Sequence, residues 1–208
     1  MTAKIKLNAA SGGGSFSLQA PSSSSNNRVF TLPDSADATL LTSTTATGKI
    51  LQVVQESKIS TASGSVGAAA YDYSSGLTGD LISKAITPSN ASNKILIRAS
   101  LMVSCDDDKQ IFARLYKDGS VVTAAVGDSS VRQRVSAAEY LSSAGRTTTI
   151  THEYLDTAGG TSAITYSYRF SHDSSSTRTI WLNRSNSDGG NTYSARGYSS
   201  LTLTEISA

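Results

Sequence analysis

The sequence predicts an all-β protein: an antiparallel β-sandwich of jelly-roll type, preceded by a Gly/Ser/Thr-rich N-terminal β segment. After Lys49, runs of β-forming residues recur at short intervals and are separated by turn residues. The composition agrees, because 38 Ser and 23 Thr stand against only 16 Asp and Glu. Hydroxyl side chains serve strand edges and turns without adding charge, which suits a surface-rich β-protein.

The chain divides by composition into residues 1–47 and a sandwich domain at 48–208. The first part contains two short apolar bursts, Phe16-Ser17-Leu18 and Arg28–Leu32, which are too small to bury a core. This part is either a flexible linker or a segment ordered by pairing with copies of itself or with a docking partner. We favour the second, because a linker has no need of large apolar side chains. The candidate docking and trimerisation residues are Phe16, Leu18, Val29, Phe30 and Leu32.

Residues 94–105 predict the clearest strand of the second part. Ile95, Ile97, Ala99, Leu101, Val103 and Cys105 occupy one phase of a period-two pattern, as expected of a half-buried antiparallel strand. The single cysteine excludes an intramolecular disulfide, and we expect it to be buried and inert. The apolar density of residues 49–55 predicts a strand buried on both faces. Residues 81–86 predict a strand that ends at Thr87-Pro88.

Further along, Asp118-Gly119 predicts a tight hairpin between 111–116 and 121–126. Residues 135–141 are expected to form a helical turn or two, and residues 146–155 another strand. The final strand is expected at 199–206, which gives eight to ten short strands with almost no helix. The aromatic residues expected in the core are Tyr166, Tyr168, Phe170 and Trp181.

Charge and targeting signals exclude several classes of protein. The net charge is +2 and the basic residues are scattered, so nucleic-acid binding is not expected. The N-terminus lacks the apolar core of a signal peptide, and no stretch approaches a membrane span of about 20 apolar residues. We therefore expect a chain that folds in the cytoplasm and is not inserted in a membrane.

No catalytic, metal or cofactor site is predicted. His152-Glu153 and His172-Asp173 are sequence neighbours on expected strands, so the members of each pair point to opposite faces and do not form an acid–base dyad. Residues 106–108 are three aspartates without the spaced ligands of a calcium loop, and we expect a solvated turn. Gly12-Gly13-Gly14 is not followed by the Lys-Ser/Thr of a phosphate loop. Tyr193 and Tyr198, near a Gly/Asn/Ser loop, are the candidate surface-binding residues, because exposed aromatic rings stack on glycans.

Several phrases, in a consistent order along the chain, resemble virion structural and tail-fibre proteins of marine bacteriophages, especially cyanophages. They are 14–21 with 28–33, then Gly48–Val54, Ile86–Asn90 with Lys94–Ile97, Leu182–Ser185, and Ala195–Ile206. The resemblance implies a location in the virion and a sandwich similar to the trimeric heads of the tumour-necrosis-factor and complement type. The chain has room only for an anchor and a head, and not for the long shaft of many tail fibres.

Together these expectations describe a homotrimeric virion protein assembled in the host cytoplasm, with no enzymatic activity. Residues 1–47 would attach it to other virion proteins, and residues 48–208 would form an exposed head of a short fibre or spike that contacts a host glycan or protein. Two alternatives remain open: a capsid decoration protein, as a cement or head-fibre component, and a soluble glycan-binding module.

Overall fold

The structure is a computed structural model that describes residues 4–8, 11–19, 23, 25, 48–68, 78–128, 132–192 and 194–208. The chain separates into two compact units, residues 1–42 and residues 43–208. The predicted domain boundary between residues 47 and 48 stays a prediction.

The first unit contains a β-hairpin. Strand β1 (Lys4–Asn8) pairs antiparallel with β2 (Ser15–Gln19), and Leu7 lies opposite Phe16 in the register. Gly12 and Gly13 in the connection have φ angles of +85° and +70°, a region that residues with a Cβ rarely enter. The apolar burst around Phe16 therefore forms a strand, as its alternation indicates.

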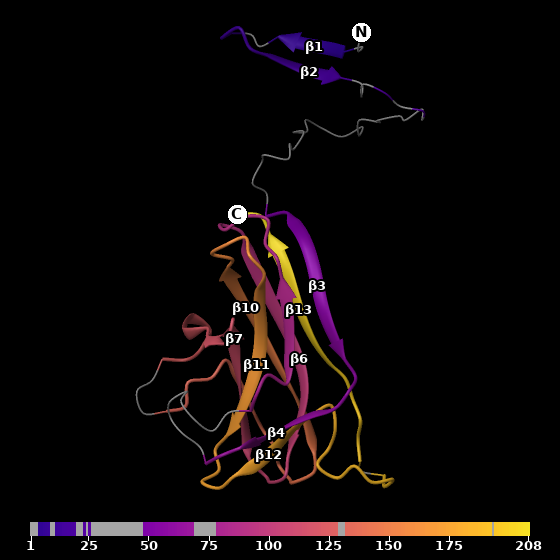
Figure 1. The fold of residues 1–208 in the computed structure, drawn as a ribbon, viewed down its shortest axis with the longest axis vertical. Helices are drawn as coiled ribbons and strands as arrows, with labels where there is room; N and C mark the ends of the chain where they lie inside the picture. The colour runs from indigo at the N-terminus through magenta and orange to yellow at the C-terminus, as the bar shows by residue number, and fades with distance from the viewer. Residues whose placement is uncertain are drawn as a thin grey trace. The chain divides into compact units, whose positions relative to one another are not determined.

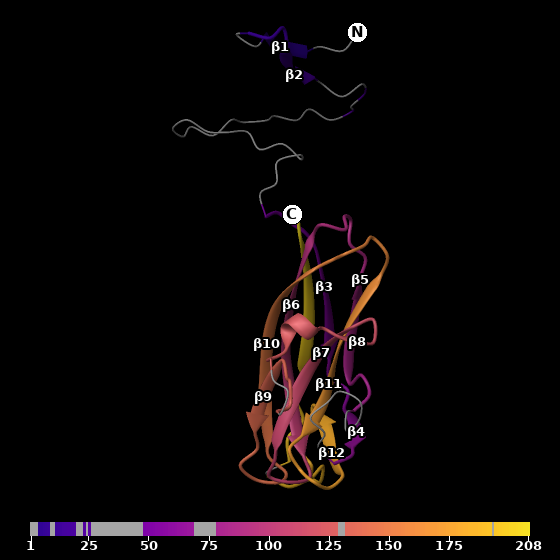
Figure 2. The same ribbon diagram turned by 90° about the vertical axis from the view of Figure 1, so that its left-hand side faces the viewer.

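The second unit is an antiparallel β-sandwich of two sheets (Figures 1 and 2), which confirms the predicted fold class. The first sheet has the order β3–β13–β6–β12–β4, and β10 pairs with the other edge of β6. Its strands are β3 (Ile50–Lys58), β4 (Ala62–Val66), β6 (Lys94–Cys105), β10 (Thr147–Thr157), β12 (Arg178–Leu182) and β13 (Ser199–Ile206). The second sheet comprises β5 (Ile82–Ile86), β7 (Gln110–Lys117), β8 (Ser120–Val121), β9 (Ala137–Tyr140) and β11 (Ile164–His172).

The strand pairs of the sandwich are nested. Strand β3 pairs with β13, β4 with β12, β5 with β11, β6 with β10, and β7 with β9, all antiparallel. The chain thus forms one long antiparallel ribbon whose tip is the region of β7–β9. Further pairing of β6 with β13 and of β7 with β11 closes this ribbon into two sheets. A long hairpin rolled up in this way is the jelly-roll arrangement.

The core lies between the sheets and follows the predicted alternation. The six residues of the apolar phase of β6, from Ile95 to Cys105, are all buried, and Tyr166, Tyr168 and Phe170 of β11 are fully buried opposite them. The tight turn at Asp118-Gly119 is also confirmed, because both residues have positive φ angles, 48° and 78°, and join β7 to β8. The predicted second strand at 121–126 is wrong beyond Val121, because Thr123–Ala125 form a 3₁₀ turn.

Three further expectations are wrong. Trp181 lies outside the core, because Ile180 and Leu182 take the inward phase of β12 and leave the indole on the outer side of the sheet. Strand β3 is not buried on both faces; it is a sheet edge, with Ile50 62% and Val53 56% exposed. Within residues 135–141, Ala137–Tyr140 form β9 rather than a helical turn, because pairing with Gln110–Ala113 of β7 supplies their backbone hydrogen bonds.

The described residues contain a single short helix, the 3₁₀ turn η1 (Thr123–Ala125). No helix among them is long and apolar enough to cross a membrane.

Candidate functional site

A long loop joins β12 to β13 at the end of the sandwich opposite the C-terminus (Figure 1). It runs from Asn183 to Tyr198, and its two ends lie side by side. The Gly197 amide donates to the Asn183 carbonyl at 3.0 Å, and Arg184 and Arg196 form an isolated β-bridge. A compact surface loop with closed ends is an Ω-loop, a type that frequently carries binding function. We call residues 183–198 the Ω-loop below.

Ion pairs hold the Ω-loop in shape. The Asp188 carboxylate accepts hydrogen bonds from the Arg196 guanidinium through both of its oxygens, and Arg184 Nη1 lies 3.4 Å from Asp188 Oδ2. The hydrogen bond from Arg196, together with the charge of Arg184, lowers the pKa of the Asp188 carboxyl below its ordinary value. Arg184 also lies over the Trp181 ring at 5.3 Å from its centre, which ties the loop to β12.

Hydroxyl and amide groups inside the Ω-loop satisfy one another. Ser185 Oγ donates to the Ser187 carbonyl at 2.7 Å and accepts from the Ala195 amide at 2.9 Å. Ser194 Oγ donates to Asn191 Oδ1 at 2.6 Å. A loop ordered by its own contacts loses little conformational entropy when a ligand binds.

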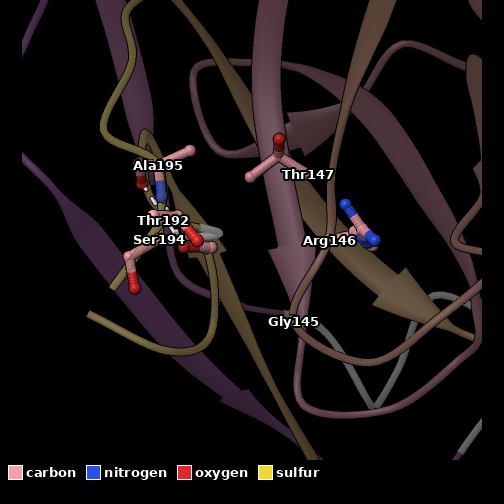
Figure 3. A pocket seen from close by; sticks show the side chains of 7 residues that line it. Gly145, Arg146, Thr147, Thr192, Ser194 and Ala195 are labelled. Carbon is pink, nitrogen blue, oxygen red and sulfur yellow. Dashed lines mark hydrogen bonds between the residues drawn. The ribbon is translucent and has the colours of Figure 1, made fainter. Parts of the chain in front are cut away.

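Two hollows lie between the Ω-loop and the turn that precedes β10. The first has a volume of about 280 Å³ and is lined by Gly145, Arg146 and Thr147 on one side and by Ser185, Thr192 and Ser194 on the other. Figure 3 shows Thr192, Ser194 and Ala195 across the hollow from Thr147, and the Arg146 side chain on the other side of the turn. The second hollow, about 270 Å³, shares Gly145 and Arg146 and adds Ala144, Asn186 and Ser187.

Arg146 is the charged group of both hollows. Gly145, with a φ of +84°, forms the turn that places Arg146 directly before β10. The side chain of Arg146 is exposed, and it has no ion pair within the part of the chain that the structure describes. No carboxylate lines either hollow among the described residues. These hollows therefore combine one cation with hydroxyl and amide groups.

A second surface is the outer face of the first sheet, away from the core. Residues paired across an antiparallel sheet share a face, and the register places Val53, Thr204, Leu96 and Leu155 in one row across β3, β13, β6 and β10. The next row contains the Arg98–Glu153 ion pair and the hydrogen bond from Gln55 to Thr202. The row beyond it holds only hydroxyl side chains, Thr151, Ser100, Ser200 and Ser57.

Five apolar side chains of this outer face lie together near the end where residue 48 enters the sandwich. Ile50, Leu51, Val53, Leu96 and Leu155 make up what we call the apolar patch. Val53 is 56% and Leu155 51% exposed, and Ile50 and Leu51 are exposed as well. Large apolar side chains clustered on one exposed face make this surface a candidate for binding a partner.

The structure covers only part of the predicted site residues. Phe16 and Leu18 lie on β2, but their side chains are outside the described part, as are Val29, Phe30 and Leu32 entirely. Tyr193 belongs to the Ω-loop and is likewise outside the described residues. Tyr198 is 52% exposed at the end of the Ω-loop. Sequence reasoning pointed to this loop through its Gly, Asn and Ser content but missed Arg146, whose turn lies about 40 residues earlier in the chain.

The two histidines serve structural contacts. His152 Nδ1 lies 2.7 Å from the Tyr168 hydroxyl between the sheets, whereas Glu153 faces outward to Arg98. Burial lowers the pKa of His152. His172 is fully buried: its Nδ1 accepts from the Ser174 amide at 3.1 Å, and its Nε2 lies 3.2 Å from the Val66 carbonyl. Glu153 therefore points away from His152, and Asp173 is exposed and accepts from the Gln110 amide at 3.1 Å, apart from the buried His172 ring.

Two of the three aspartates at 106–108 contact cations of the protein itself. Arg178 Nη2 lies 2.6 Å from Asp107, and Lys109 lies between Asp107 and Asp108. Asp106 accepts from the Thr179 amide at 3.1 Å. Among the described residues, no group of three or more His, Cys, Asp or Glu side chains is placed to hold a metal ion.

Comparison with known proteins gives little. No family model matches the chain. No curated protein matches it either. Among solved structures, a chain from the structure of the infectious bursal disease virus Gx strain is similar, with a TM-score of 0.36 and 16% identity. The match covers 76% of this chain but 38% of the viral chain, so the chain spans less than half the length of that neighbour.

Proposed function

We propose that the chain is a structural component of a bacteriophage particle, a homotrimeric short fibre or spike. Residues 1–47 attach it to other virion proteins, and the sandwich forms an exposed head directed to the host surface. The observation that carries this proposal is the apolar patch on the outer face of the first sheet. The ordered phrases that resemble marine-phage virion proteins support the same class of protein.

The apolar patch fits a second copy of the same chain. Strand β3 pairs only with β13 among the described strands, and no described strand pairs with its other edge. Charged residues and proline usually protect a free edge from pairing with another chain. The first six residues of β3, 50–55, include neither. The charged row beside the patch is balanced, because Arg98 and Glu153 pair with each other. A neutral apolar surface that ends in a free edge suits packing between identical subunits.

The same proposal assigns no enzymatic activity. Catalysis by acid and base needs two groups that converge on one substrate, and the contacts of His152 and Glu153 direct them to opposite faces of β10. Both ring nitrogens of His172 lie against backbone groups in the interior. We therefore expect no glycan or peptide cleavage by the wild-type protein in activity assays. Changing His152 and His172 to Ala together should leave that result unchanged.

Immunogold electron microscopy of purified particles tests the proposal. Antibodies against residues 48–208 should label particles of a phage that encodes the chain, at the tail or at a projecting spike. Labels spread evenly over the capsid shell would instead support a decoration protein. Absence of the chain from gradient-purified particles would overturn a virion role.

A further inference from the structure

We propose that the two hollows at Arg146 form a binding site for a saccharide that carries a carboxylate, such as a uronic or sialic acid residue. The site goes beyond a structural role in the particle and does not depend on trimer formation. It lies on the Ω-loop and the turn before β10, at the end of the sandwich away from the apolar patch.

The charge of the site selects an anion. Arg98, Arg169, Arg178, Arg184 and Arg196 are each paired with a carboxylate, whereas Arg146 is exposed without an ion pair within the described ranges. A guanidinium can bind a carboxylate through two parallel hydrogen bonds, which are stronger and more specific in geometry than hydrogen bonds between neutral groups. No described carboxylate lines either hollow. A carboxylate on the ligand would therefore meet no competing carboxylate among the described lining residues.

The walls of the site select a polyhydroxylated ligand. Thr147, Thr192 and Ser194 line the first hollow, and Asn186 and Ser187 line the second. These side chains can both donate and accept hydrogen bonds, as sugar hydroxyls do. The first hollow, of about 280 Å³, lies just below the range typical of drug-sized ligands, which indicates room for a sugar unit rather than a larger molecule.

The scaffold makes the site ready to bind. Asp188 holds Arg184 and Arg196 away from the hollows, and the hydrogen bonds of Ser185 and Ser194 fix the loop wall. Binding by one hollow is expected to be weak, because the site is shallow and polar. Several copies on one particle would raise the effective affinity for a surface coated with such sugars.

Nuclear magnetic resonance titration of the full chain tests the site, with methyl glucuronide as the probe and methyl glucoside as its neutral counterpart. We expect methyl glucuronide to shift the amide signals of residues 145–147 and 185–195 at millimolar concentration, and methyl glucoside to bind at least about tenfold more weakly. Arg146→Gln should lose the preference for the acidic sugar. Lys49→Gln, which removes one positive charge at the other end of the sandwich, should keep it.

Two further measurements decide what kind of site it is. Acetate should bind more weakly than methyl glucuronide, and Thr147→Val should weaken the sugar but not acetate. Equal binding of acetate and glucuronide, retention of the preference in Arg146→Gln, or no binding of either sugar would each overturn the proposal. Leu155→Asp, directed at the apolar patch, should leave the titration unchanged, so the site and the assembly are tested separately.

Discussion

At the scale of single residues, Glu205 shows how the sandwich accommodates a buried charge without a cation. Its carboxylate accepts hydrogen bonds from Gln52 Nε2 at 2.5 Å, Asn93 Nδ2 at 2.6 Å, and the Ser89 amide and hydroxyl at 2.7 and 2.8 Å. Burial raises the pKa of this carboxyl, but these hydrogen bonds more than offset the effect and lower the pKa to about 2 from 4.5.

The lowered pKa of Glu205 predicts acid sensitivity. A group whose pKa is lower in the folded state stabilises the protein fully above its unfolded pKa, and this stabilisation is lost as the pH falls from 4.5 towards 2. Glu205→Gln should lower the free energy of unfolding by about 1–3 kcal/mol at pH 7, because the NH₂ group of the new glutamine would face the hydrogen-bond donors that surround the carboxylate. Thermal melts between pH 7 and pH 2 should show a smaller fall in Tm for the variant than for the wild type. An equal fall in both would show that Glu205 does not contribute to acid unfolding.

Cys105 gives a second test at this scale. It closes the apolar phase of β6, it is fully buried, and burial raises the pKa of its thiol to about 11. The thiolate is the reactive form, so the native protein should react with a thiol reagent only slowly. A Ser57→Cys variant, which places a thiol on the exposed side of β3, should react at once at that position. Rapid modification of Cys105 without denaturant would contradict the packing of β6.

At the scale of elements, the β4–β12 pair depends on close packing at Gly64. A Cβ at this position would lie 2.6 Å from Cγ2 and 2.7 Å from Cβ of Thr78. Thr78 cannot move easily, because its amide donates to the Phe170 carbonyl and its hydroxyl accepts from the Phe170 amide, both at 2.9 Å. Gly64→Ala should therefore destabilise the protein by about 1–3 kcal/mol in denaturant unfolding. Gly67→Ala, where the added Cβ meets nothing within 4 Å, is the control and should change little.

Local patterns were sufficient to predict the elements whose burial alternates or whose turn chemistry is specific. The apolar phase of β6, the Asp118-Gly119 turn and the strand at 199–206 all follow from period two and from the positive φ that a tight turn requires. The errors lie where pairing with a distant strand decides. Residues 137–140 become a strand because β7 offers them a free edge, and β3 is exposed because it lies at a sheet edge.

The candidate site could be predicted only in part for the same reason. The Gly, Asn and Ser content of residues 185–191 indicates an exposed loop near Tyr198. The approach of Arg146 to that loop depends on the pairing of β10 with β6, which no local pattern encodes. The apolar patch could not be predicted from the sequence either, because only the register of the sheet brings Val53, Leu96 and Leu155 into one row.

At the scale of the whole molecule, the sandwich should fold without residues 1–47. Every strand pair of the sandwich lies within residues 48–208, and the chain enters it at Lys49, whose amide donates to Ser207 Oγ at 3.0 Å. A 48–208 fragment should be soluble and β-rich by circular dichroism and should unfold in one cooperative transition. It should fail to join particles, and changing Phe16, Leu18, Val29 and Phe30 to Ser should have the same effect. Incorporation of the fragment at normal copy number would place the anchor in the sandwich.

Self-assembly through the apolar patch is the central claim, and light scattering coupled to size-exclusion chromatography tests it most directly. The full chain should have about three times the monomer mass of 21.6 kDa at micromolar concentration. Leu155→Asp, which places a charge at the β10 end of the patch, beside Leu96, should reduce this to the monomer mass. Tyr140→Asp, the same kind of change at an exposed side chain of β9 in the other sheet, should leave the trimer intact. A monomer mass for the wild-type chain, or a trimer mass for Leu155→Asp, would contradict the claim.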